Sequence, residues 1–299
     1  MNHYISYFNT SWLSETDGPG KRLVLFLQGC PLDCAWCHSP HSQPSESPLL
    51  YFDSLCLGCQ RCEEACPQGV HSFINGEHQI QRDQCTKCGS CLEACPQSSE
   101  FARGSALALP TRKSDVDTLF EKIRPQLEML QNEGGITFSG GEPLLQSESL
   151  TILAKKCKEA GFHTALETSG IVSLKSIEMI EPFIDTWLFG MRLVTGTSTF
   201  TSDYLEKQTR KSLQFITESK NASVIVRIPV IPGYTDTNKY LETARRIISE
   251  YSLEHIELLK HNRESSHYYD ALNSKASIEY NEHEAVNNYK LVTEFFNIN

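Results

Sequence analysis

The chain has 299 residues, 39% of them hydrophobic, and a formal net charge of −10, which predicts a globular protein with a sizeable apolar core. The acidic balance, without a long basic run, argues against nucleic acid as a partner. No stretch has the roughly 18 consecutive apolar residues of a membrane span, and the first residues lack a signal-peptide pattern, so we expect no membrane contact and a cytoplasmic protein.

The first predicted element is a strand over residues 22–28, an almost continuous apolar run of the kind that is buried on both faces. Cys30 follows it directly. From residue 50 to about residue 103 the sequence has eight cysteines, two Cys-Pro steps and few long apolar stretches. This composition predicts an inserted module that folds around metal more than around an apolar core. The predicted domains are the first part of the main fold, the insert and the remainder of the main fold: residues 1–49, 50–103 and 104–299.

Helical and strand-like patterns alternate after the insert. The segment from Ser114 to Asp117 predicts a helix start, with Pro125 as a kink further along. The predicted strands here are residues 135–139, 163–167, 186–189, 224–230 and 255–259. The predicted helices are residues 146–160, 173–181, 204–219, 237–251 and 283–295, and in the first of these Cys157 shares the apolar face of Leu150, as a small buried hydrophobe would. Six strands alternating with helices predict an α/β fold with a parallel sheet, and in a barrel the chemistry lies at the carboxyl ends of the strands.

The eight cysteines of the insert form two runs with the same spacing, C-x2-C-x2-C-x3-C-P, which holds bacterial [4Fe–4S] clusters. In two-cluster repeats of this type the fourth cysteine of each run serves the other cluster. The predicted ligands are therefore Cys56, Cys59, Cys62 and Cys95 for one cluster, and Cys85, Cys88, Cys91 and Cys66 for the other. Electron relay or docking of an electron donor is the expected role. A purely structural role stays open, because metal binding alone can fold such a module.

The run Cys30-x3-Cys34-x2-Cys37 has three thiols only. A four-iron cluster held by three thiolates keeps one iron open for a substrate. The alternative is a structural zinc site, which needs four ligands, and only His38 and His41 lie close by in the sequence. The neighbouring ferredoxin-type runs favour iron and sulfur over zinc.

This three-cysteine run, with Gln28-Gly29 before it and Trp36 before its last thiol, resembles the signature loop of the radical S-adenosylmethionine (SAM) superfamily. Further segments are similar to the glycyl-radical-enzyme activating enzymes, the group that includes pyruvate formate-lyase activase, and to its larger members with two auxiliary clusters. These segments span nearly the whole chain and are Asp17–Gly20, Leu27–Cys30, Trp36–Pro40, Ser139–Pro143, Glu167–Gly170 and Arg227–Asp236.

The resemblance implies a fold, cofactors and partners. The fold would be a partial (β/α)6 barrel, similar to a TIM barrel, with a ferredoxin-like insert. The cofactors would be three [4Fe–4S] clusters, SAM and a monovalent cation. The reaction would be reductive cleavage of SAM to methionine and a 5′-deoxyadenosyl radical, which takes hydrogen from a backbone glycine of a partner glycyl radical enzyme. An electron donor such as flavodoxin or ferredoxin is the second implied partner.

The resemblance also assigns residues, beginning with Cys30, Cys34 and Cys37 as the catalytic cluster ligands. The implied cofactor-binding residues are Trp36, Cys37, His38, Gly140, Gly141, Glu142, Glu167, Thr168, Gly190, Met191, Arg192, Arg227 and Asn262. The two glycines after the second predicted strand would let the backbone approach the methionine amino group of SAM. Plain packing remains an alternative for Trp36. Asp17 and Gly18 are implied to receive the partner's glycine loop, although this segment also reads as a turn before the first strand.

The chain departs from the family pattern at two strand ends. Where the family has Asp-x-Lys, this chain reads Gly190-Met191-Arg192. Arg192 can still bind a carboxylate as a fork, whereas Gly190 brings no carboxylate to a cation. After the sixth strand Asn262 takes the place of the family's histidine, and His261 is displaced by one position and reads equally as a strand-end histidine.

Two other functions fit part of the pattern. One is radical chemistry on a small molecule or peptide, with the insert carrying auxiliary clusters. The other is a cluster-bearing electron-transfer protein that no longer cleaves SAM, which the residues at Gly190 and Asn262 would explain.

Overall fold

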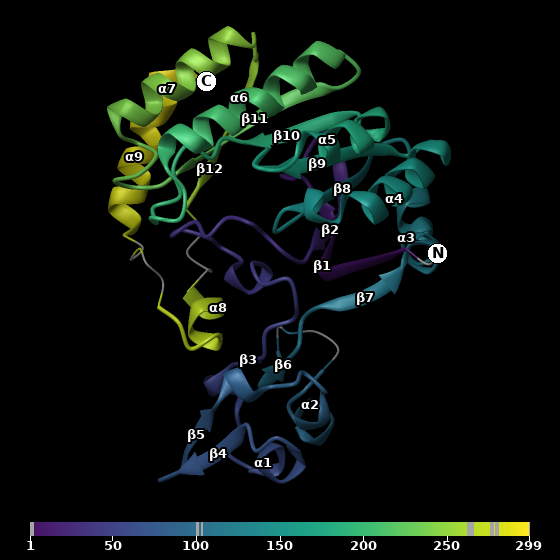
Figure 1. Cartoon of the computed structure of the whole chain (residues 1–299), viewed down its shortest axis with the longest axis vertical. Coiled ribbons are helices and arrows are strands. Elements are labelled where there is room, and N and C mark those ends of the chain that lie inside the picture. Colours follow the sequence, from purple (N-terminus) through teal and green to yellow (C-terminus); the bar gives the residue numbers. More distant parts are fainter. Residues whose placement is uncertain are drawn as a thin grey trace.

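The computed structural model describes residues 3–99, 102, 104–261, 266–275, 278 and 281–298. Its centre is an eight-stranded sheet in the order β12-β11-β10-β9-β8-β2-β1-β7 (Figure 1). Six neighbouring strands of this sheet are parallel. They are the six predicted strands: β2 (Lys21–Leu27), β8 (Gly134–Gly140), β9 (His163–Thr168), β10 (Thr186–Gly190), β11 (Ser223–Val230) and β12 (His255–Lys260). The predicted α/β fold with a mostly parallel sheet is confirmed.

Two antiparallel strands that the sequence prediction lacks, β1 (Tyr4–Ser14) and β7 (Arg112–Asp115), extend the sheet beyond β2. The pairing of β1 with β2 has register shifts, which interrupt the alternation of apolar and polar side chains that marks a strand. The helix start predicted in the segment from Ser114 to Asp117 is confirmed. Ser114 itself belongs to β7, and the helix begins after Asp115, whose side chain accepts a hydrogen bond from Thr118 N (2.9 Å).

The predicted helices are present with small shifts at their ends. They are α3 (Val116–Leu130), α4 (Ser147–Glu159), α5 (Leu174–Ile180), α6 (Ser202–Ser219), α7 (Asn238–Glu250) and α9 (Glu282–Phe296). Helix α3 continues through Pro125, and Ser173, Thr201 and Thr237 cap α5, α6 and α7 with their side-chain oxygens. In the part of the chain that the structure describes, no helix is both long and apolar enough to cross a membrane.

The parallel strands have one apolar face and one polar face, because successive side chains of a strand point to opposite sides. On the apolar face, strand residues such as Leu25, Phe138 and Val226 join buried residues of α3 to α7 in one core cluster. The other side of the alternation carries the polar residues Arg22, Thr137, Ser139, His163, Glu167, Arg227 and Glu257. Arg22, expected in an apolar strand, is fully buried here and donates to Thr137 Oγ1 at 3.0 Å.

The insert projects from the main sheet as a separate lobe, with α8 (Ser266–Ala271) beside the junction (Figure 1). Its strands β3 (Leu50–Tyr51) and β6 (Leu107–Ala108) pair at the junction, and it contains the hairpin of β4 (His71–Ile74) and β5 (Glu77–Ile80) with helices α1 (Arg61–Ala65) and α2 (Ser90–Ala94). Its buried core is Leu49, Cys62, Val70, Cys91 and Leu107. A core this small, with two cysteines in it, supports a module that depends on metal.

Candidate active site

The loop that follows β2 carries Cys30, Cys34 and Cys37 at the carboxyl end of the strand. The backbone N–H of Cys30 donates to the carbonyl of Gln43 (3.1 Å), and that of Cys37 donates to the carbonyl of Cys34 (3.0 Å). The side-chain amide of Gln28 donates to two carbonyls across the base of the loop, at 2.9 and 2.8 Å. These contacts hold the three thiols on one ordered turn.

The three thiols of this loop are partly buried and free of disulfides. Burial raises the pKa of Cys37 to about 12 and also raises the pKa of Cys30 and of Cys34. The Glu142 carboxylate is the next cause of the raised pKa at Cys30. A metal ion would reverse this preference for the neutral thiol, because a coordinated thiol is deprotonated outright.

His41 does not complete a zinc site with the three loop thiols. A structural zinc site needs four ligands, and this histidine stacks on Tyr268 with 3.9 Å between ring centroids. Three thiols without a fourth ligand fit an iron–sulfur cluster with one open iron better than a structural zinc ion.

Gly140 and Gly141 end β8 against the base of the cysteine loop. A Cβ atom at Gly141 would lie 2.2 Å from the carbonyl oxygen of Gly29, and one at Gly140, where φ is +121°, would lie 2.3 Å from Leu27 N. Both positions require glycine because β8 packs directly on the end of β2. The pair therefore positions the loop, and its contact with the amino group of SAM stays a prediction.

Glu142 is buried and ties the end of β8 to the end of β9. Its Oε1 accepts from Thr168 Oγ1 (2.9 Å) and Leu144 N (3.3 Å), and its Oε2 accepts from the N–H (2.9 Å) and the hydroxyl (2.7 Å) of Ser169. Burial raises the pKa of Glu142, and these hydrogen bonds oppose the shift. Since both oxygens are used by the chain, Glu142 and Thr168 are positioning residues, and their contact with a cofactor or cation stays a prediction.

Arg227 on β11 is 2% exposed and faces three carboxylates. Its Nε donates to Glu257 (2.9 Å), and its Nη1 lies 3.4 Å from Glu167 Oε1 and 3.8 Å from Asp17 Oδ1. Burial opposes ionisation of Glu167, but Arg227 and then a hydrogen bond from Ser139 (2.7 Å) outweigh it and lower the pKa of Glu167. Arg227 thus holds together the charged face of the sheet, and its contact with SAM stays a prediction.

Arg192 follows β10 and brings a second positive charge to the cysteine loop. Its Nη1 is buried and, within the described residues, has no hydrogen-bond partner. Its charge opposes the burial that raises the pKa of Cys34 and Cys37. A Cβ at Gly190 would lie 3.1 Å from Nη1, so the glycine leaves room for the guanidinium beside the strand end. A buried donor without a protein partner needs a ligand group or a water molecule as its acceptor, and contact of Arg192 with the carboxylate of SAM stays a prediction.

The remaining predicted cofactor residues differ in burial and in surroundings. Trp36 is buried against Tyr234, with 5.4 Å between ring centroids, in a small apolar cluster, which supports packing as its role. Met191 is fully buried in the main core. His38 is exposed on the cysteine loop, where the charges of Glu167 and Arg192 act on it with opposite signs. Asn262 lies outside the described residues.

Two cavities in the insert divide its cysteines into the predicted sets. The first, called here the Cys62 cavity, is lined by Cys56, Cys59, Cys62 and Cys95. The second, the Cys91 cavity, is lined by Cys66, Cys85, Cys88 and Cys91. This interleaved arrangement is the one that two-cluster repeats use, so the residues present fit two [4Fe–4S] clusters.

Comparison with known proteins identifies the family. A family model described as a 4Fe-4S single cluster domain matches residues 16–187. The indoleacetate decarboxylase activating enzyme of Tractidigestivibacter scatoligenes is 32% identical over 251 residues, which cover 79% of this chain and 76% of that protein. The chain belongs to the glycyl-radical-enzyme activating enzymes. It is therefore a radical SAM oxidoreductase with a [4Fe–4S] cluster that activates a glycyl radical enzyme.

Other relatives of this activating enzyme agree. The (2S)-3-sulfopropanediol dehydratase activating enzyme of Klebsiella oxytoca is 31% identical over 304 residues and covers 97% of this chain and 93% of that protein. A solved domain of pyruvate-formate lyase-activating enzyme from Bacteroides vulgatus ATCC 8482 covers 55% of this chain and 95% of that chain, at 22% identity and a TM-score of 0.38. That structural likeness is too weak to carry an argument.

Sequence motifs alone do not find every polar group near the activating enzyme's cysteine loop. Glu257 pairs with Arg227 from β12, and the alternation along that strand is the signal that places it on the polar face. Burial raises the pKa of Tyr269 on α8, and the loop thiols Cys37 and Cys34 add to this shift. No local sequence pattern indicates this interaction, because α8 is far from the cysteine loop in the sequence. His261 follows β12 directly and is partly buried, and burial lowers its pKa.

Proposed function

We propose that Cys30, Cys34 and Cys37 hold a [4Fe–4S] cluster with one open iron, and that Arg192 binds the carboxylate of SAM beside it. The observation that carries this proposal is the buried Nη1 of Arg192, which has no partner within the described residues and whose charge reaches two loop thiols. The bound cluster supplies the electron that cleaves SAM to methionine and a 5′-deoxyadenosyl radical. The chain's own residues orient SAM and keep water from the reacting atoms.

The other residues of the site have supporting roles in this proposal. Gly140, Gly141 and Glu142 fix the cysteine loop against the ends of β8 and β9, so that the three thiols that would hold the cluster keep a constant position in the site. Backbone groups of Trp36, Cys37 and His38 would border the adenine. This assignment is supported by the ordered turn of the loop, in which His38 is exposed and the charge of Arg192 acts on it.

The position of Arg192 also affects whether this site would hold the implied monovalent cation. Gly190 offers no carboxylate, and Glu167 is already paired with Arg227 and hydrogen-bonded by Ser139. We infer that the guanidinium of Arg192 supplies the positive charge on this side in place of a bound cation. SAM cleavage should then be the same in sodium, potassium and tetramethylammonium salts of equal ionic strength.

The substitution Arg192→Leu should weaken SAM binding roughly 10- to 150-fold, because hydrogen bonds to a charged group contribute about 1.5–3 kcal/mol. Arg192→Lys should recover part of this, since it keeps the charge but not the fork. Equilibrium binding of SAM to the iron-loaded protein measures both. Arg124→Leu, which removes an exposed arginine on α3, is the matched control. Unchanged affinity in Arg192→Leu would remove this residue from the site.

The fold and the insert complete the proposal. The six parallel strands, with helices on the apolar face, support a partial (β/α)6 barrel formed by residues 1–49 and 104–299. The lobe of residues 50–103 supports a ferredoxin-like module with two further [4Fe–4S] clusters, three in all. Cys59 and Cys88, one from each ligand set, are exposed, which suits electron entry from a donor such as flavodoxin or ferredoxin.

Asp17 and Gly18 are proposed to border the entry of the partner's glycine loop. Asp17 faces Arg227 (3.8 Å), and a Cβ at Gly18 would lie 3.5 to 3.6 Å from Thr137 and Ala165, so this turn crosses the polar side of the sheet. The relatives' names include activators of decarboxylases, lyases and a dehydratase. We propose a glycyl radical enzyme of one of these classes as the partner.

The proposed chemistry is tested on the anaerobically iron-loaded, reduced protein. With SAM it should form 5′-deoxyadenosine and methionine in equal amounts, detected by liquid chromatography. Protein that contains its full iron and binds SAM but forms no 5′-deoxyadenosine would support the electron-transfer alternative and overturn the proposal.

A further inference from the structure

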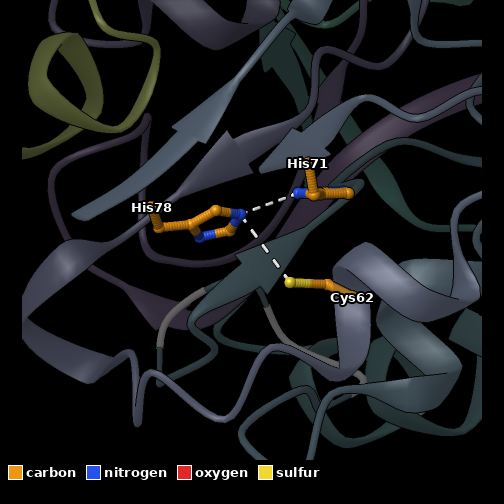
Figure 2. A group of neighbouring side chains, drawn as sticks. All are labelled: Cys62, His71 and His78. Atoms are coloured by element: carbon orange, nitrogen blue, oxygen red, sulfur yellow. Dashed lines mark hydrogen bonds between the residues drawn. The ribbon is translucent and has the colours of Figure 1, made fainter. Parts of the chain in front are cut away.

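A pair of histidines lies between the two cysteine-lined cavities of the insert. His78 lines the Cys62 cavity, and His71 lines the Cys91 cavity. Figure 2 shows the two imidazoles pointing toward each other from the β4–β5 hairpin, with Cys62 of α1 beside them. His71 Nδ1 and His78 Nε2 are 2.9 Å apart, and His78 Nε2 is 3.7 Å from Cys62 Sγ. The pair therefore connects one cavity with the other.

Packing fixes the position of His78. Its ring stacks on Phe73 with 4.4 Å between centroids and an interplanar angle of 6°, and Tyr51 meets it edge-on at 4.6 Å. Phe73 and His78 are also paired directly across the two strands of the hairpin. His71 is 2% exposed. Because His78 packs against two aromatic rings and His71 is buried, the fold of the hairpin fixes the position of both imidazoles beside Cys62.

The hydrogen-bond chemistry selects one arrangement of protons. A thiolate that binds iron carries no hydrogen, so the 3.7 Å contact between Cys62 Sγ and His78 Nε2 is a hydrogen bond only when the hydrogen of His78 lies on Nε2. That hydrogen is shared with His71 Nδ1, which then accepts. The remaining hydrogen of neutral His71 must lie on its Nε2, a buried atom that has no partner within the described residues. Nε2 belongs to the side chain that lines the Cys91 cavity.

We propose that the His71–His78 pair is a hydrogen-bonded link between the two auxiliary clusters, with His78 donating to the Cys62 thiolate and His71 donating into the Cys91 cavity. The inference rests on the proposed two-cluster insert and adds to it a pair of positioning residues. A hydrogen bond to a cluster sulfur stabilises the more negative, reduced state, so each imidazole raises the reduction potential of the cluster it contacts. The link keeps both potentials in a range where electrons pass between the clusters.

The test is a potentiometric titration of the iron-loaded, full-length protein, followed by electron paramagnetic resonance. In His78→Phe one auxiliary cluster should be harder to reduce, with the ratio of reduced to oxidised cluster at a fixed ambient potential about tenfold lower, which is 59 mV for one electron. His71→Phe should shift the other cluster in the same direction. His78→Gln, which keeps a side-chain N–H, should stay near the wild-type value. His283→Phe, at an exposed histidine of α9, is the matched control and should shift neither.

The iron and zinc content of the protein distinguishes failure of the proposed two-cluster insert from failure of the proposed histidine link. Wild-type protein that holds about four irons would contradict the two-cluster insert itself. Protein with about twelve irons whose auxiliary potentials are the same in both phenylalanine variants would overturn only the histidine link. Loss of a cluster from His78→Gln as well as His78→Phe would also overturn it, because the imidazole would then serve assembly. One bound zinc at Cys62, His71 and His78, whose ligand atoms lie within 4.8 Å of one another, would replace it with a mononuclear site.

Discussion

Replacement of Cys30, Cys34 and Cys37 together by alanine should abolish formation of 5′-deoxyadenosine, a loss of at least about a thousandfold. The three thiols lie on one loop at the end of β2, and the substitution removes every proposed thiolate ligand of the reactive cluster. The two clusters proposed for the insert should be retained, because its eight cysteines line two separate cavities. Iron content should therefore fall by about one third while cofactor cleavage disappears.

The matched control for this triple variant is Cys157→Ala. Cys157 is fully buried in the apolar main core, where it packs as a small hydrophobic residue and is not part of any of the three cysteine runs. Its replacement should leave iron content and cofactor cleavage unchanged, with only a modest loss of stability. Residual cleavage by the triple alanine variant would show that the reactive cluster is held elsewhere.

Arg227→Leu should lower the free energy of unfolding by about 3 kcal/mol, the lower end of the range for breaking a buried ion pair. The substitution leaves Asp17, Glu167 and Glu257 facing one another without their shared cation. The lower end applies because these carboxylates are 22% to 42% exposed and partly screened. Denaturant unfolding at neutral pH measures the loss.

The stability difference between Arg227→Leu and wild type should depend on pH. In the wild type the pKa of Glu167 is lowered, so its pairing stabilises the fold above the ordinary glutamate pKa of about 4.3. That contribution is lost as the pH falls through the lowered pKa, and the gap between the two proteins should narrow there. Arg124→Leu, on the exposed side of α3, should change stability by no more than about 0.5 kcal/mol at any pH. A gap of that small size for Arg227→Leu would contradict the ion-pair network.

The six parallel strands and the helices between them could be predicted because each has a strong local pattern. The strand at residues 22–28 is apolar, and the helix starts carry capping residues such as Ser173, Thr201 and Thr237. The two cysteine sets expected from the repeated spacing agree with the residues that line two cavities of the insert, and their role as cluster ligands stays a prediction. Strand β1 could not, because bulges break its alternation.

The geometry around the cysteine loop depends on contacts that no spacing encodes. Gly141 is needed because Gly29, far away in the sequence, approaches it closely. From the sequence, Gly190 indicated only that the aspartate of the family pattern is missing. The structure shows that the glycine also makes room for the guanidinium of Arg192. The link between His71 and His78 depends on the pairing of a hairpin that carries no special motif. Side chains of this kind become visible only once the strands are placed in register.

The most direct test of the account mixes the reduced, iron-loaded protein and SAM with a candidate glycyl radical enzyme, starting with one encoded beside it. Electron paramagnetic resonance under anaerobic conditions should show a glycyl radical on the partner, and the triple alanine variant at Cys30, Cys34 and Cys37 should give none. Cleavage of SAM without a radical on any candidate partner, together with conversion of a small molecule in the absence of a protein partner, would contradict the account.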